Sequence, residues 1–201
     1  MRKFNAGSGS VGGSPFEKDE WECIDYSCDG SEAWHGPAIY HKFDLKETWP
    51  IENDSVDCIF ASHILEHIEY KHQRKVAQEF FRVLKVGAPI RIICPDPRIF
   101  IENWRAKNWN FVKNCYGEEN WKRNGYEGNP SKSFSDMFYE DNYDHVLCPG
   151  IDMISMMLMR AGFPKITEMR YSNTEFPQFF GDYENTLDNR PVMSWYLEAV
   201  K

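Results

Sequence analysis

The chain has 201 residues, of which 42% are hydrophobic and 15% aromatic. That composition excludes a disordered chain and predicts a single globular domain over residues 1–201. Acidic residues outnumber basic ones by 31 to 23, and the net charge of −8 disfavours binding to nucleic acid or to an anionic membrane through bulk charge. No segment approaches the roughly 20 apolar residues of a membrane-spanning helix, and the N-terminus lacks the apolar run of a signal peptide, so we expect a cytoplasmic protein.

The cysteines stand singly, without a Cys-x-x-Cys pair. Neither a disulfide framework nor a zinc site is therefore predicted. We expect reduced, mostly buried thiols at all six positions, which are Cys23, Cys28, Cys58, Cys94, Cys115 and Cys148.

Strands dominate the first part of the sequence. Apolar runs predict strands over 2–6, 21–25, 38–43 and 55–61. Only eleven residues, 10–20, separate the first two strands, so the first helix of an alternating fold is expected to be short or missing. Over 73–84 apolar residues recur at three-to-four spacing, which predicts an amphipathic helix that stops before Gly87.

The second part continues the alternation after one unusual segment. A buried strand is predicted over 89–94, a helix over 151–161, and two final strands over 165–171 and 194–200. Between them, about residues 98–150 are crowded with aromatic, Asn and Gly residues, and their helical pattern is broken. Strands that alternate with helices predict an α/β fold, a Rossmann-like sandwich around a mainly parallel sheet.

A glycine-rich turn follows the first predicted strand. Its sequence, Gly7-Ser8-Gly9-Ser10-Val11-Gly12, fits the Gly-x-Gly-x-x-Gly fingerprint of dinucleotide-binding folds. Asp25 ends the second strand, where such folds place a carboxylate for ribose hydroxyls. It follows Gly12 by only thirteen residues, whereas the fingerprint expects about 20, so the spacing argues against an NAD site. A turn without a ligand, with Asp25 as a local cap, is the alternative interpretation.

Polar side chains also stand where the fourth predicted strand ends. Apolar Ile59-Phe60-Ala61 leads into Ser62-His63-Ile64-Leu65-Glu66-His67. Ligands of open α/β sheets bind at the carboxyl ends of the strands, which makes Ser62 and His63 candidates for ligand contact.

These motifs, in this order, resemble the class I S-adenosylmethionine (SAM) dependent methyltransferases, in the small-molecule, type 11-like branch with Ser-His-x-Leu-Glu-His after strand four. The matching positions are Gly7-Ser8-Gly9, Asp25, Asp44-Leu45 after the third strand, Ser62 to His67, and Lys85-Val86-Gly87-Ala88 in place of Lys-Pro-Gly-Gly. The resemblance covers nearly the whole chain except about 98–150. It implies SAM as cofactor, and a final antiparallel hairpin made by the last two strands.

The resemblance also implies which residues hold SAM. The methionine part would lie against the turn made by Asn5, Ala6, Gly7, Ser8 and Gly9. Many relatives have an acidic residue for the cofactor's ammonium group in this motif, whereas Asn5 supplies no charge.

Further along, Asp25 would accept hydrogen bonds from the ribose hydroxyls, and Asp44 from the adenine amino group beside the Leu45 backbone. Ser62 and His63 would lie near the methionine end. For Asp44, a carboxylate that merely stabilises its own turn is the alternative.

Three residues are candidates for catalysis or acceptor contact, namely His63, Asp96 and His145. His63 has the side chain best suited to general base chemistry near neutral pH, although it can also line the pocket without moving a proton. His63 and His67 are four residues apart and would share a helix face, but the sequence suggests no third ligand nearby, so no metal is expected.

The resemblance implies a small-molecule acceptor, by analogy a sugar or a polysaccharide precursor, under an aromatic-rich cap formed by about 98–150. An NAD-type oxidoreductase remains an alternative, supported only by the glycine-rich motif. A non-catalytic SAM-binding protein of the same fold is a second alternative, because Asn5 stands where many relatives have a charged acidic residue. A nucleic-acid base methyltransferase is disfavoured, since Ser62-His63-Ile64-Leu65 replaces the expected Asn/Asp-Pro-Pro-Tyr motif.

Overall fold

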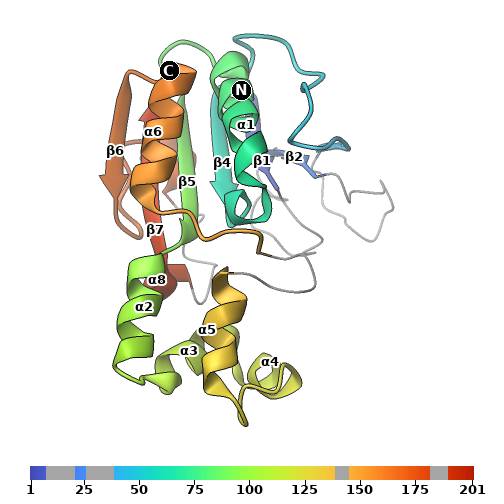
Figure 1. Cartoon of the computed structure of the whole chain (residues 1–201). Helices are drawn as coiled ribbons and strands as arrows, with labels where there is room; N and C mark the ends of the chain where they lie inside the picture. Colours follow the sequence, from blue (N-terminus) through green and yellow to red (C-terminus); the bar gives the residue numbers. More distant parts are fainter. Residues whose placement is uncertain (8–20, 26–38, 139–144, 182–189) are drawn as a thin grey trace.

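The computed structural model describes residues 1–7, 21–25, 39–138, 145–181 and 190–201 (Figure 1). Within them, seven strands form one sheet in the order β3-β2-β1-β4-β5-β7-β6. The strands are β1 (Lys3–Ala6), β2 (Trp21–Ile24), β3 (Ile39–His41), β4 (Cys58–Ser62), β5 (Pro89–Pro95), β6 (Lys165–Met169) and β7 (Ser194–Val200). The first five pair in parallel, whereas β7 is antiparallel to both β5 and β6. The expected mainly parallel sheet with an antiparallel C-terminal hairpin is confirmed.

Two helices cover one face of this sheet. They are α1 (Tyr70–Val83) and α6 (Ile151–Ala161), which lie side by side in front of the strands in Figure 1. Alternate residues of β4 show how the sheet is buried on both faces: Ile59 and Ala61 join the large core beneath these helices. Cys58 and Phe60 join a smaller core on the other face, which includes Phe180 of the short helix α7 (Pro177–Phe180). A strand buried on both faces has a continuous apolar run, as this one does.

The aromatic-rich segment contains a lobe of short helices beyond the carboxyl ends of the parallel strands (Figure 1). They are α2 (Pro97–Arg105), α3 (Trp109–Tyr116), α4 (Glu118–Arg123) and α5 (Pro130–Phe138). Gly117, with φ +79°, separates α3 from α4. The lobe has small cores of its own, one around Phe100 and one around Trp121. The broken helical pattern of the sequence therefore corresponds to several short helices.

The observed bounds of the helices and strands lie within a few residues of the predicted ones. The main difference is at the predicted ligand-binding edge. The strand expected over 55–61 begins at Cys58, and the helix expected over 73–84 begins at Tyr70. After Ser62 the chain does not enter a helix directly. His63 has a left-handed backbone with φ +53°, and a single 3-10 turn, η3 (Leu65–His67), precedes α1. The prediction of a short or missing first helix falls on residues 10–20, outside the described residues.

Candidate functional site

The carboxyl ends of three parallel strands meet at one edge of the sheet. In the strand register, Ala6 of β1 pairs with Ile24 of β2 on one side and with Ala61 of β4 on the other. The next residues along these strands, Gly7, Asp25 and Ser62, therefore lie next to one another. The strand order reverses between β1 and β4, and crevices at such switch points are where open α/β sheets bind ligands.

The turn after β1 is packed very closely. Gly7 has φ +72°, and its N–H donates to the carbonyl oxygen of Ile24 at 2.8 Å. A Cβ atom on Gly7 would lie 2.3 Å from Cγ1 of Ile64. Both the conformation and the contact therefore require glycine here. Asn5 and Ala6 are buried in the strand before it, and Ser8 and Gly9 lie outside the described residues.

Asp25 is buried directly after β2, and its N–H donates to the carbonyl oxygen of His41 in β3. The structure thus fixes a carboxylate at the strand end where the sequence predicts the ribose contact.

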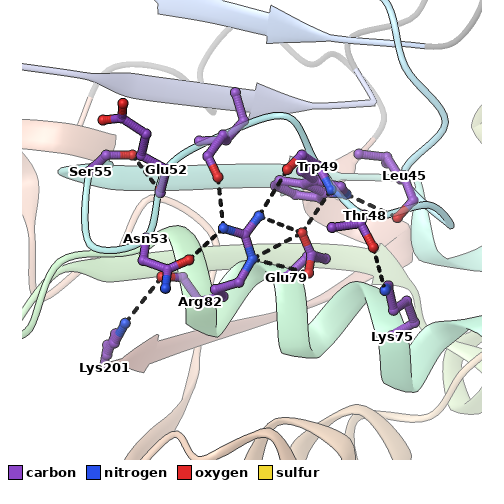
Figure 2. A network of polar contacts seen from close by, with 11 residues as sticks. Leu45, Thr48, Trp49, Glu52, Asn53, Ser55, Lys75, Glu79, Arg82 and Lys201 are labelled. Carbon is purple, nitrogen blue, oxygen red and sulfur yellow. Dashed lines mark hydrogen bonds and ion pairs between the residues drawn. The ribbon is translucent and has the colours of Figure 1, made fainter.

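The segment after β3 is held by a hydrogen-bonded network. The Asp44 carboxylate accepts from the Lys46 N–H at 2.9 Å and faces the Lys46 ammonium at 3.2 Å, so it does stabilise its own turn. Leu45 is buried, and its carbonyl oxygen accepts from the Trp49 indole N–H at 3.0 Å. Figure 2 shows how the guanidinium of Arg82, on α1, donates to the carbonyl oxygen of Trp49.

The same network lowers the pKa of a buried carboxylate. Glu79 accepts from Arg82 at 2.6 Å and from the Trp49 backbone N–H at 2.8 Å (Figure 2). Burial alone would raise the pKa of Glu79, but these hydrogen bonds outweigh it, and the pKa lies below its ordinary value. Helix α1 thereby anchors the 45–55 segment, and with it the predicted adenine contact.

His63 lies at the end of β4 between two polar side chains. Its Nε2 lies 2.8 Å from the Ser194 hydroxyl at the start of β7, and its Nδ1 lies 3.3 Å from Oε1 of the fully buried Glu66. When Nδ1 carries its proton toward Glu66, Nε2 can accept from Ser194. The hydrogen bond with Ser194 and the close approach to Glu66 define the orientation of the imidazole at the strand end. No sequence pattern pointed to Ser194, which is 131 residues away.

His67 does not share a helix face with His63, because no continuous helix connects them. Its ring instead meets that of His145 edge to face, with the centroids 5.0 Å apart. The N–H of Val146 donates to the carbonyl oxygen of Glu66 at 2.9 Å, which fixes this approach. Donor atoms of Glu66, His67 and His145 all lie within 4.8 Å of one another, a group that does not include His63. The expectation that no metal binds stays a prediction.

Asp96 caps helix α2. Its carboxylate accepts from the Arg98 backbone N–H at 2.9 Å and from the Arg98 guanidinium at 2.8 Å. Its own N–H donates to the carbonyl oxygen of Met193, just before β7. These contacts describe a helix cap, and acceptor contact by Asp96 stays a prediction.

The cysteines of the described residues are free thiols. Burial raises the pKa of Cys58, Cys115 and Cys148 to about 12, and that of Cys94 well above its usual range. Neutral thiols are poor nucleophiles, in agreement with the expectation of structural cysteines. Cys28 lies outside the described residues.

Known proteins resemble this chain in both sequence and structure. Residues 23–92 match the sequence model of a family described as a methyltransferase domain. A SAM-dependent methyltransferase from Archaeoglobus fulgidus is 14% identical with a TM-score of 0.61, and the match covers 100% of this chain and 86% of that one. One from Thermotoga maritima, described as a possible histamine N-methyltransferase, is 16% identical with a TM-score of 0.60 and coverage of 100% and 82%.

A phosphoethanolamine N-methyltransferase from Haemonchus contortus, solved in complex with SAM, is 15% identical with a TM-score of 0.56. That match covers 100% of this chain and 48% of the other. A search of the curated proteins found no match.

The fold is that of the class I SAM-dependent methyltransferases. Residues 23–92 are similar to the methyltransferase domain family, and over the whole chain the structure shows the class I methyltransferase fold. The fold that the resemblance implies is thus confirmed. In the part of the chain that the structure describes, no helix is both long and apolar enough to cross a membrane. The roles of individual residues and the cytoplasmic location stay predictions.

Proposed function

We propose that the protein transfers a methyl group from SAM to a small-molecule acceptor, with a sugar or a polysaccharide precursor as the expected class. The observation that carries the proposal is the register that sets Gly7, Asp25 and Ser62 next to one another at the switch point of the sheet. The family match and the structural neighbours support the same reaction.

The residues at this edge fit the cofactor. Asp25 is a buried carboxylate that would accept hydrogen bonds from both ribose hydroxyls. Gly7 has no side chain, so the ligand would contact the backbone of this turn directly. On this proposal Asn5, Ala6, Gly7, Ser8 and Gly9 contact the methionine part, Asp44 and Leu45 the adenine, and Ser62 and His63 the methionine end.

When bound, SAM supplies an electrophilic methyl group, so the main task of the protein is to hold the acceptor in line and to exclude water. His63 is the candidate general base, because Glu66 and Ser194 hold its two nitrogens in a defined orientation. His145 and Asp96 are proposed to border the acceptor. The thiol of Cys148, three residues after His145, donates to the carbonyl oxygen of Pro95, which directly precedes Asp96, and this contact supports a shared location for the two residues.

The acceptor site is proposed to lie under the helical lobe, within the aromatic-rich cap of about 98–150. Trp104 is 42% exposed and stacks on Phe134, with the ring centroids 5.1 Å apart, so it offers an aromatic surface for a sugar ring. Trp121 is buried in the lobe and fills its core. Tyr139 lies outside the described residues. Trp104→Ala should raise the KM for the acceptor and spare SAM affinity, and an unchanged KM would exclude this surface.

Cofactor binding is tested by titration calorimetry on Asp25→Ala, with Glu119→Ala, an exposed carboxylate of α4, as the matched control. Loss of two charge-assisted hydrogen bonds should weaken SAM binding by roughly thirty- to a thousandfold, whereas the control should bind normally. A thermal-shift panel of SAM, S-adenosylhomocysteine, NAD and NADP tests the class of ligand. Stabilisation by NAD alone, or full SAM affinity in a folded Asp25→Ala variant, would overturn the assignment.

A further inference from the structure

Three side chains that can bind a metal converge where η3 meets the segment ahead of α6. Glu66 and His67 belong to η3, and His145 comes from a distant part of the chain. One donor atom from each lies within 4.8 Å of the other two. The cluster is built on a fixed backbone, because the N–H groups of Val146 and Leu147 both donate to the carbonyl oxygen of Glu66, at 2.9 and 3.3 Å.

The donor set selects the class of ion. Two imidazoles and one carboxylate are a set that zinc takes in proteins, with a water molecule in the fourth position. Magnesium and calcium prefer oxygen donors only, so the two nitrogens argue against them. Bond lengths of about 2.0 to 2.2 Å place the donors of a tetrahedral zinc site roughly 3.4 Å apart. The imidazoles of His67 and His145 are half-buried, and an ion bound here would require the donor atoms to move closer together than the 4.8 Å within which they now lie.

The carboxylate is the part of the cluster that a cation would stabilise most. Glu66 is 0% exposed, and a buried negative charge is costly unless positive charge lies close by. One of its oxygens faces Nδ1 of His63 at 3.3 Å. A carboxylate has two oxygens, so Glu66 can be oriented by His63 and still bind an ion, as metal-binding carboxylates commonly are.

We propose that Glu66, His67 and His145 bind one Zn²⁺ ion or a similar first-row transition-metal ion. The ion would join the chain that follows β4 to the chain that precedes α6. None of the three donors belongs to the set proposed to contact SAM, although His145 is also proposed to border the acceptor and Glu66 faces His63. The test measures metal binding alone and needs no methyl transfer, so its outcome is independent of the proposed function.

The experiment uses the full chain, stripped of metal with a chelator and titrated with Zn²⁺ near neutral pH by calorimetry. One equivalent should bind, and zinc at about 100 times its Kd should raise the melting temperature by about 5 to 10 °C. His67→Gln and His145→Gln should each weaken zinc binding by more than about 100-fold. His72→Gln is the matched control, because His72 is a half-exposed histidine on α1, and it should bind zinc as the wild type does.

Cobalt provides a readout of the donors. Co²⁺ in the site should give the visible absorption of a four- or five-coordinate nitrogen and oxygen environment, and His145→Gln should abolish it. Circular dichroism verifies that the glutamine variants are folded. Less than about a tenth of an equivalent of zinc in folded wild type would overturn the proposal. So would unchanged affinity in both glutamine variants, or an intense thiolate-to-cobalt band that assigns the binding to cysteines.

Discussion

Replacing Gly7 by Ala tests how the turn after β1 is packed against the turn after β4. The new Cβ would lie 2.3 Å from Cγ1 of Ile64, 2.5 Å from its Cδ1 and 2.7 Å from its Cβ. The last atom is fixed to the backbone, so a rotamer change of Ile64 cannot relieve the whole contact. The backbone at Gly7 also has φ +72°, which an L-residue adopts at a cost.

The two costs can be separated. The left-handed conformation costs about 1 to 2 kcal/mol, and forcing an extra carbon into a packed site costs about 1 to 3 kcal/mol more. Gly7→Ala should therefore lower the free energy of unfolding by about 2 to 5 kcal/mol. Gly87 is the matched control, because it has φ +81° but no neighbouring atom within 4 Å of the position that a Cβ would take. Gly87→Ala should therefore lower the free energy of unfolding only by the cost of the left-handed conformation, about 1 to 2 kcal/mol.

Urea unfolding followed by circular dichroism measures both variants, and the midpoints are compared at a common slope. A double-mutant cycle with Ile64→Ala isolates the contacts of Cγ1 and Cδ1, and the coupling between the two changes should recover part of the packing cost, because the Cβ at 2.7 Å remains. If Gly7→Ala is no more destabilising than Gly87→Ala, the close approach of the two turns is wrong, and with it the packing of the proposed cofactor edge.

Three further predictions concern charged groups. Arg91→Met should lower the free energy of unfolding by about 3 to 5 kcal/mol, because the guanidinium lies 2.6 Å from Glu198 and both side chains are 1% exposed. The double variant Arg91→Met/Glu198→Leu should recover most of the lost stability. A loss below about 1 kcal/mol in the single variant would contradict the role of this buried ion pair. Because the folded pKa of Glu79 is lowered from 4.5, its hydrogen bonds stabilise the fold above that pH and are lost as the pH falls through the folded pKa. The stability difference between wild type and Glu79→Gln should accordingly be largest near neutral pH and shrink below about 4.5, and a difference independent of pH in denaturation titrations would refute it. With an acceptor in hand, His63→Gln should lower kcat and remove the ionisation of His63 from its pH profile, whereas an unchanged profile would leave the residue structural.

The order of strands and helices could be predicted from the sequence because the patterns that define them are local. The apolar run before Ser62, the three-to-four spacing that leads to Leu84, and the final strand from Ser194 each depend on neighbouring side chains. The sequence likewise indicated the positions of Asp25 and His63 at strand ends. A parallel sheet then brings those ends to a common edge, whatever the sequence between them.

The contacts made by these positions were decided only by the tertiary structure. Ser194 meets His63 because β7 inserts beside β5, and His145 meets His67 because the chain ahead of α6 returns to η3. The left-handed backbone at His63, which removed the expected helix face shared with His67, likewise depends on its surroundings. Such contacts join residues that are far apart in the chain, so no local pattern of hydrophobicity or charge encodes them. Only the packing of the elements against one another determines which side chains meet.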